Sequence, residues 1–340
     1  SFMTMLLLAT LLSALTPPPC LTTVPRNHSA HTAQKTRRKM FALLLPPALS
    51  LLAGSAPSPA APRAGRGARM AGGDVPSIIV GGGRIGSALK ELGVEGDVVL
   101  RRGDAFPATP ASGPIYVTTR NDDLAGVVAA TPPERRQDLV FMQNGMLGEF
   151  LEEQGLPDAT QVLLYLAVAK LGEPPIDGIT DTNPDGLTTA KGRWAEAFRA
   201  RLAGGGLTCH VKQGDEYTKA MLEKHVWICA FMVTGALHGG VTVGEVESAH
   251  ASQLRALVDE LCAAGEAALG VRLEPGAFER LAAYGRSVAH FPTAVKEFEW
   301  RNGWFHKISQ RALAEGRPDP LPLHTAALQE LGVVKEGARV

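Results

Sequence analysis

The first 73 residues contain no aspartate and no glutamate, although they carry eight lysines and arginines. The whole chain is formally neutral, so the remainder, from Asp74 on, holds 26 basic and 34 acidic residues and a formal charge of −8. An acidic body is repelled by phosphate backbones and by anionic lipid. We therefore expect no nucleic-acid partner and, in the mature form, no membrane partner.

Cysteine is also scarce, and the chain has only Cys20, Cys209, Cys229 and Cys262. None has a Cys-x-x-Cys neighbour, and the three that follow residue 73 are an odd number, which argues against a disulfide framework. The nine histidines show no metal-ligand spacing. These absences indicate a reducing compartment, buried thiols and no metal site.

The first 73 residues also lack a long apolar run, because their apolar stretches at residues 5–15 and 40–56 are too short to span a bilayer. The second follows the basic KTRRK and ends in small residues, as a secretory signal does. Residues 57–73 are typical of a transit peptide. We predict a disordered targeting leader over residues 1–73, of the bipartite kind that directs proteins to plastids of secondary origin. Two alternatives stay open: residues before Met40 are not translated, or the leader is not functional and the protein is cytoplasmic.

Short apolar strands alternate with helical patterns over residues 74–211, which predicts a Rossmann-like, doubly wound α/β sheet. From residue 215 to about 334 the pattern is almost entirely helical. Breaks are expected at Gly239-Gly240, Gly270, Pro275-Gly276 and Arg317-Pro318. We predict a Rossmann-like domain over residues 74–212, an all-α domain for substrate binding and dimerisation over residues 213–335, and ligands in the cleft between them.

A glycine-rich turn follows the first predicted strand and begins the first predicted helix, in SIIVGGGRIG at residues 77–86. Gly81 permits the tight turn, Gly83 lets a pyrophosphate approach the backbone, and Gly86 lets helix and strand pack closely. This context favours a dinucleotide site over the alternative, a turn without a ligand. The predicted cofactor-binding residues of the turn are Gly81, Gly82, Gly83, Arg84, Ile85 and Gly86.

The choice of dinucleotide depends on the residues about twenty positions after the first glycine, where an acid would bind the ribose of NAD. That position holds Arg101, followed by Arg102, and no acid ends the second strand. Guanidinium groups bind a 2′-phosphate with charge-assisted hydrogen bonds, so we predict NADP(H) as the cofactor. Arg120 is a third candidate for the phosphates. The alternative is a solvated arginine pair at a strand end.

Asn144, in QNG, comes directly after a predicted buried strand, at the edge of the sheet where ligands bind. A side-chain amide there can contact a nicotinamide or a substrate oxygen. Asn-Gly is also a common turn former, so a structural role stays open.

Lys224 is surrounded at helical spacing by Ala220, Met221, Trp227 and Ile228, whereas Lys219 has mostly charged neighbours. We expect Lys219 to be a salt-bridged surface residue. A lysine on an apolar stripe either snorkels to solvent or faces a pocket, where burial lowers its pKa and improves it as a proton donor. We favour the pocket for Lys224.

Glu297, in KEFEWRNG, stands four residues before Arg301. It either forms a helix-surface ion pair with that arginine or lines the cleft and accepts a hydrogen bond from a substrate hydroxyl. In the second case Trp300 and Trp304 wall the site.

Over about residues 77–332 these features resemble the ketopantoate reductases (2-dehydropantoate 2-reductases), within the 6-phosphogluconate dehydrogenase-like superfamily. The glycine turn, Arg101 and Arg120 match the family's cofactor site. The resemblance implies that Asn144 lies beside nicotinamide and substrate, that Lys224 is the catalytic lysine, and that Glu297 binds a substrate hydroxyl. It implies an oxidoreductase that transfers hydride from NADPH to a 2-oxo acid.

The sequence departs from this family where substrate is bound. Ile228 and Met232 stand where the family usually carries asparagines, and only Ser287 and Thr293 are candidates for the serine that binds the substrate carboxylate. Two alternatives follow: a β-hydroxyacid dehydrogenase of the same superfamily, and an inactive NADP-binding regulatory protein. The aromatic-rich last helices offer a surface for a homodimer.

Overall fold

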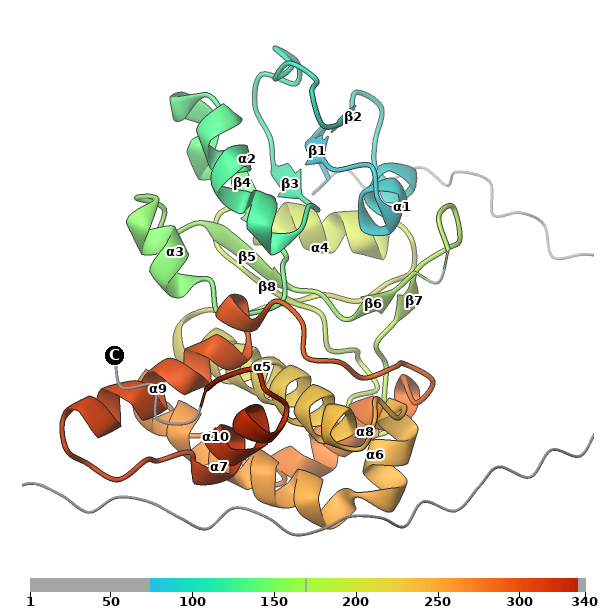
Figure 1. Ribbon diagram of the computed structural model, residues 1–340. Coiled ribbons are helices and arrows are strands. Elements are labelled where there is room, and N and C mark those ends of the chain that lie inside the picture. The colour runs from blue at the N-terminus through green and yellow to red at the C-terminus, as the bar shows by residue number, and fades with distance from the viewer. Residues whose placement is uncertain (1–73, 169, 336–340) are drawn as a thin grey trace, which may run out of the picture. The chain divides into compact units, whose positions relative to one another are not determined.

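The computed structural model describes residues 74–168 and 170–335 (Figure 1). The predicted targeting leader therefore lies outside the described residues, and its role and the plastid location stay predictions. The described residues belong to one compact unit.

A seven-stranded sheet forms the first half of the described chain, in the order β2-β1-β3-β4-β5-β8-β9. All neighbours are parallel except β5 and β8. The strands are β1 (Ile78–Val80), β2 (Val98–Leu100), β3 (Ile115–Val117), β4 (Leu139–Phe141), β5 (Thr160–Leu163), β8 (Thr189–Lys191) and β9 (His210–Val211). The chain runs from β1 to one side for β2 and returns to the other side for β3, so the order reverses beside β1. Ligands of doubly wound sheets bind at such a switch point, and here the glycine turn follows β1.

Helices cover both faces of this sheet because successive side chains of each buried strand point to opposite faces. Ile78 of β1 packs in the core with Leu124 and Leu151, whereas its neighbour Ile79 packs with Leu89 and Phe198. The helices are α1 (Arg84–Leu92), α2 (Leu124–Ala130), α3 (Gly148–Glu153) and α4 (Ala195–Ala203), with short 3-10 segments η1 (Asn121–Asp123) and η2 (Pro133–Asp138). The predicted Rossmann-like sheet is confirmed.

The apolar segment that begins at Thr160 forms two short strands. β5 ends at Leu163, and the short β6 (Leu166–Ala167) turns to pair with β7 (Ile176–Asp177) as a separate two-stranded hairpin. The intervening Leu164 and Tyr165 leave the sheet toward the helical part.

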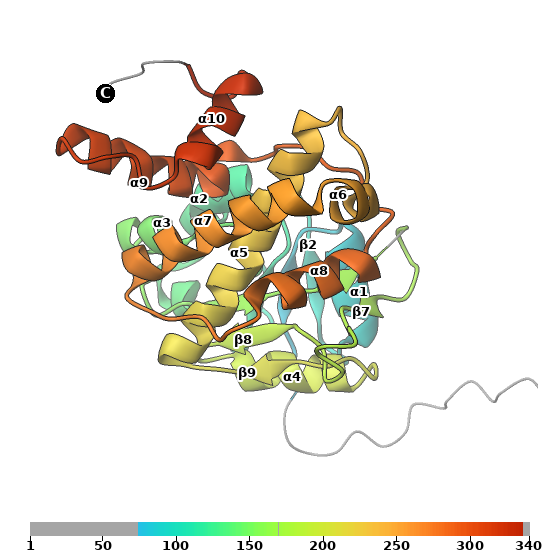
Figure 2. The same ribbon diagram turned by 90° about the horizontal axis from the view of Figure 1, so that it is seen from below.

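The second half is all-α, as predicted, and is built around the long α5 (Gly214–Leu237). By length and composition α5 is able to cross a bilayer, but 67% of its most apolar window is buried within the protein, as in a core helix. It contacts β5 and β8 of the sheet and the helices α7 and α8 (Figures 1 and 2). The other elements are α6 (Val243–Ala249), α7 (Ala251–Leu269), α8 (Ala277–Ser287), η3 (Phe298–Trp300), α9 (Asn302–Ala314) and α10 (Pro322–Glu330).

The four predicted helix breaks are present, and a further non-helical segment extends over residues 288–297. Its backbone pairs with the start of α6: Val243 N–H donates to Phe291 O at 2.9 Å and Gly244 N–H donates to Ala289 O at 2.9 Å. Pro292, which lacks a backbone N–H, makes an isolated bridge with Thr242. This segment delivers Glu297 to the start of η3. The boundary between two domains near residue 212 stays a prediction.

Candidate active site

The glycine turn has the conformation that a nucleotide-binding turn requires. Gly81 has φ +108°, and a Cβ there would lie 2.7 Å from Thr118 Oγ1. A Cβ on Gly86 would lie 1.9 Å from Gly81 O, so only glycine lets α1 approach β1 this closely. A Cβ on Gly83, in contrast, would meet no atom within 4 Å, and no side chain caps the α1 N-terminus after it. The turn thus leaves open space at the end of the helix where an anion is favoured.

The neighbouring turn residues are placed differently. Arg84 donates from Nη1 to Val168 O at 3.0 Å, and Ile85 packs against the sheet core. Gly82 leaves room for Arg101, whose Nε would be 3.5 Å from a Cβ at that position.

Two cavities lie against this turn. The larger, of about 750 Å³, is lined by Gly81, Gly82, Leu100, Arg101, Arg102, Gly103, Asp104, Phe106, Thr119, Leu171 and part of α2. The smaller, of about 560 Å³, is lined by Gly81, Gly83, Arg102, Thr118, Thr119, Arg120, Asp122 and Asp123. All three predicted arginines thus face cavities beside the glycine turn. The volumes are those of small-molecule sites, and these residues fit a dinucleotide.

Two acids that sequence reasoning missed also line the larger cavity. Asp104 accepts a hydrogen bond from Arg101 N–H at 2.8 Å, and Asp123 pairs with Arg102 at 3.4 Å. The Arg102 side chain is 90% exposed, so this pair is weak and leaves the guanidinium available to a ligand.

Asn144 and Gly145 lie in the loop that follows β4. Gly145 has φ +121°, and a Cβ there would lie 2.4 Å from Trp300 O. Met146 N–H donates to the same Trp300 oxygen at 2.9 Å, while Asn121 donates to Asn144 O at 3.0 Å. The loop is therefore fixed against the η3 segment. Among the described residues, none hydrogen-bonds the Asn144 side-chain amide.

Lys224 is 92% buried, in the middle of α5. Its Nζ donates to Leu164 O at 2.5 Å and lies 4.0 Å from the centre of the Tyr165 ring. Trp227, Ile228 and Phe231 of the same helix are also buried. Burial, with the positive charge of Arg301 as a smaller cause, lowers the pKa of Lys224 to about 7. The side chain does not snorkel to solvent.

Glu297 and Arg301 form an ion pair between Glu297 Oε2 and Arg301 Nη2. It is not the helix-surface pair that the spacing suggested, because Glu297 precedes η3 and Arg301 precedes α9. Glu297 has φ +48° and is the one non-glycine residue with positive φ among the described ranges. The two side chains are only 25% and 15% exposed, so the pair is largely withdrawn from water.

Arg301 links the candidate residues, and sequence reasoning did not name it as a site residue. It pairs with Glu297, its charge acts on Lys224, and it follows Trp300, whose carbonyl holds the loop after Asn144. The structure thus joins Glu297 to the loop after Asn144 through Trp300 and Arg301. Among the described residues, Lys224 is related to that segment only through the charge of Arg301. The sequence signal that could have identified Arg301 is its position directly before Asn302-Gly303.

The tryptophans and the Asn-Gly pair have packing roles. Trp300 makes an edge contact with Phe150 at 5.5 Å and Trp304 with His225 at 5.6 Å, measured between ring centres. Asn302 is buried and hydrogen-bonds His324 at 2.9 Å. A Cβ on Gly303 would lie 2.7 Å from Phe298 O.

The hydroxyls of the two serine-like candidates bond to backbone carbonyls. Thr293 Oγ1 donates to Val241 O at 2.5 Å, and Ser287 Oγ donates to Tyr284 O at 2.8 Å. Neither hydroxyl is placed to bind a substrate carboxylate.

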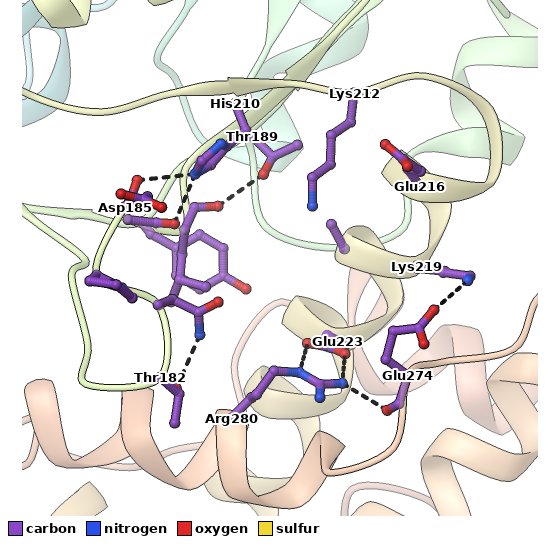
Figure 3. A pocket seen from close by; sticks show the side chains of 16 residues that line it. Thr182, Asp185, Thr189, His210, Lys212, Glu216, Lys219, Glu223, Glu274 and Arg280 are labelled. Atoms are coloured by element: carbon purple, nitrogen blue, oxygen red, sulfur yellow. Dashed lines mark hydrogen bonds and ion pairs between the residues drawn. The ribbon is translucent and has the colours of Figure 1, made fainter.

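A third cavity, of about 530 Å³, lies where α5 and α8 meet the ends of β8 and β9 (Figure 3). Its charges are mostly paired, Lys219 with Glu274 at 2.9 Å and Arg280 with Glu223. Lys219 is thus salt-bridged, as expected, although its partner is distant in sequence. Tyr165, whose ring contacts Lys224, also lines this cavity.

Among residues 74–168 and 170–335, no group of three or more histidines, cysteines or acids is placed to hold a metal ion. The three cysteines of this range are free thiols, and burial raises the pKa of Cys209 and Cys262 to about 12.

No protein-family model matches the chain, and no curated protein sequence is significantly similar to it. Solved structures do match. A 2-dehydropantoate 2-reductase from Geobacter metallireducens has 18% sequence identity and a TM-score of 0.52, over 77% of this chain and 100% of that one. A ketopantoate reductase from Ralstonia eutropha has 16% identity and a TM-score of 0.53, over 76% and 99%.

A D-mandelate dehydrogenase solved with NADH has 14% identity and a TM-score of 0.53, over 76% of this chain and 98% of that one. The chain therefore has the ketopantoate reductase fold, a Rossmann-like sheet followed by an all-α part.

Proposed function

We propose that the protein is an NADP(H)-dependent oxidoreductase that reduces a 2-oxo acid, with Lys224 as the proton donor. The observation that carries the proposal is the Lys224 amine, which is 92% buried and held by Leu164 O and the face of the Tyr165 ring, where burial lowers its pKa to about 7. A pKa near the operating pH is what general acid catalysis requires. The structural neighbours that carry this fold include 2-oxo acid reductases and a dehydrogenase solved with NADH, in support of the same chemistry.

The cofactor site in this proposal is the glycine turn with its two cavities. The backbone at Gly81–Gly86 would hold the pyrophosphate, and Arg101, Arg102 and Arg120 would bind the adenosine phosphates. Bound NADPH supplies the hydride. The positive charge of Arg101 and Arg102 favours the 2′-phosphate of NADPH, and the negative charge of Asp104 and Asp123 opposes it. The measured preference for NADPH over NADH therefore shows whether the arginines outweigh the acids.

The chain's own residues supply the proton and the alignment. Lys224 Nζ, held by Leu164 O and the face of Tyr165, would donate a hydrogen bond and then a proton to the oxygen of the carbonyl that is reduced. The unpaired amide of Asn144 would orient the reacting groups. Glu297 is also predicted to accept a hydrogen bond from a substrate hydroxyl. Its carboxylate would then bind that hydroxyl and Arg301 at the same time.

The test is NADPH oxidation by wild type, Lys224→Ala and Lys219→Ala with a panel of 2-oxo acids. We expect Lys224→Ala to lose at least a hundredfold in kcat while binding NADPH as wild type does, because general acid catalysis contributes about that much. Lys219→Ala, on the same helix but salt-bridged at its edge, should keep full activity. A fully active Lys224→Ala variant would overturn the assignment.

Wild type assayed in both directions, with 2-oxo acids and NADPH and with 3-hydroxy acids and NADP+, decides between the alternatives. Oxidation of 3-hydroxy acids without reduction of any 2-oxo acid would favour the β-hydroxyacid dehydrogenase, and NADPH binding without turnover would favour a regulatory protein. One structural neighbour, a ketopantoate reductase from Staphylococcus aureus, is described as dimeric, and we propose a homodimer here also.

A further inference from the structure

The residues proposed to act on the substrate, Lys224, Asn144 and Glu297, include no group that binds its carboxylate. In a 2-oxo acid the carboxylate is bonded directly to the carbonyl carbon, so the group that binds it must lie beside the proton donor. Lys224 is the proposed donor, and the hydroxyls of Ser287 and Thr293 are committed to backbone carbonyls.

Arg301 has the free donors that this task needs. A guanidinium has five N–H donors in a fixed plane, which matches the two oxygens of a carboxylate. Within the described part of the chain, Glu297 is the one hydrogen-bond partner of this side chain, through Nη2. Arg301 Nε is buried there without a partner. A buried N–H without an acceptor is costly, so a ligand oxygen that reaches it would be favoured.

An ion pair, an anchored neighbouring residue and burial restrict the position of Arg301. Glu297 holds Nη2, the preceding Trp300 carbonyl accepts from Met146 N–H, and the side chain is 85% withdrawn from solvent. An arginine held in this way loses little conformational freedom when it binds a ligand. The charges of these groups also favour an anionic ligand. With Lys224 protonated, Lys224, Arg301 and Glu297 together carry one net positive charge, which is complementary to a monoanion.

We infer that Arg301, oriented by Glu297, binds the carboxylate of the substrate and places its 2-oxo group against Lys224. This rests on the proposed function for its choice of substrate class. Besides the proposed contact with a substrate hydroxyl, Glu297 then acts as a positioning residue for Arg301, and the selected substrates are acids rather than neutral ketones.

A binding experiment tests the inference without turnover. The probes are anilino(oxo)acetate, the 2-oxo acid analogue present in a structure of a D-mandelate dehydrogenase of this fold, and its uncharged methyl ester. Both are titrated calorimetrically into the NADPH complex of wild type, Arg301→Leu, Arg301→Lys and Arg311→Leu. Arg311 is an exposed arginine of α9, the helix that follows Arg301, and serves as the control.

We expect Arg301→Leu to weaken the acid about tenfold to a hundredfold and the ester less than threefold, since a charged hydrogen bond is lost only with the acid. Arg301→Lys should fall between wild type and Arg301→Leu, because it keeps the charge and loses the planar fork. It also keeps the test decisive if Arg301→Leu does not fold. Arg311→Leu should bind both probes as wild type does.

Equal losses for acid and ester, or unchanged acid binding by either Arg301 variant, would overturn the inference, as would a wild type that binds neither probe. Failure of the proposed function looks different, since the acid would bind through Arg301 while no 2-oxo acid is reduced. Reduction of acids at wild-type KM by Arg301→Leu would uphold the function and refute the role of Arg301.

Discussion

At the scale of single residues, the site depends on charges that are held out of water. Burial lowers the pKa of Lys224, and the positive charge of Arg301 lowers it further. Arg101 and Arg102 are in the opposite situation, at the edge of an open cavity with acids nearby. We propose that Lys224 and Arg301 act in the chemistry and that Arg101 and Arg102 select which dinucleotide is bound.

Cofactor preference is the prediction at this scale. Replacing Arg101 and Arg102 by alanine should raise the Kd of NADPH about tenfold to a hundredfold and change the Kd of NADH less than threefold, because only NADPH carries the 2′-phosphate. Fluorescence titration of both nucleotides measures this, with Arg311→Ala as the control. Equal Kd values for NADPH and NADH in wild type would remove the case for NADP(H).

At the scale of elements, a buried arginine fastens α4 to the first strands of the sheet. Arg201 of α4 has a fully buried side chain and pairs with Asp97 at 3.0 Å and Asp74 at 3.1 Å. It also lies 4.8 Å from the centre of the Tyr116 ring, and burial raises the pKa of that phenol. Asp97 in turn accepts from Ser77 N–H at 2.7 Å, directly before β1.

Removing this arginine should therefore destabilise the whole sheet. We expect Arg201→Met to lower the free energy of unfolding by about 3–5 kcal/mol, because it leaves a buried carboxylate unpaired. Arg199→Met removes a surface pair with Glu196 from the same helix and should cost at most about 1 kcal/mol. Urea unfolding compares the two, and a loss below 1 kcal/mol for Arg201→Met would show that the pair is not needed.

The elements also show what the sequence predicts and what it leaves out. The glycine turn can be predicted from the order of its glycines between a strand and a helix. The burial of Lys224 can be predicted from the apolar residues three and four positions away. Arg201 is not predictable in this way, since Asp97 is 104 residues away. Arg301 was missed because the direction of its side chain depends on the left-handed backbone of Glu297 and on the non-helical segment 288–297, whose sequence pattern is helical.

At the scale of the whole molecule, the site exists only where separate parts of the chain meet. Leu164 and Tyr165 leave the sheet at the end of β5 and receive the Lys224 amine, and the start of η3 meets the loop after β4. The environment that lowers the pKa of Lys224 is thus supplied by the sheet and by the helices together. A measurement of that pKa in the working protein reports on the assembled site.

The most direct test is the pH dependence of kcat/KM for reduction of a 2-oxo acid by NADPH. Lys224 must be protonated to act as the acid, and its pKa is lowered from 10.5 to about 7, so the protonated fraction falls above that pH. We predict that kcat/KM decreases about tenfold per pH unit above about 7, and that Lys224→Ala loses this decrease while Lys219→Ala retains it. A wild-type profile that stays flat between about pH 6 and pH 9 would contradict it.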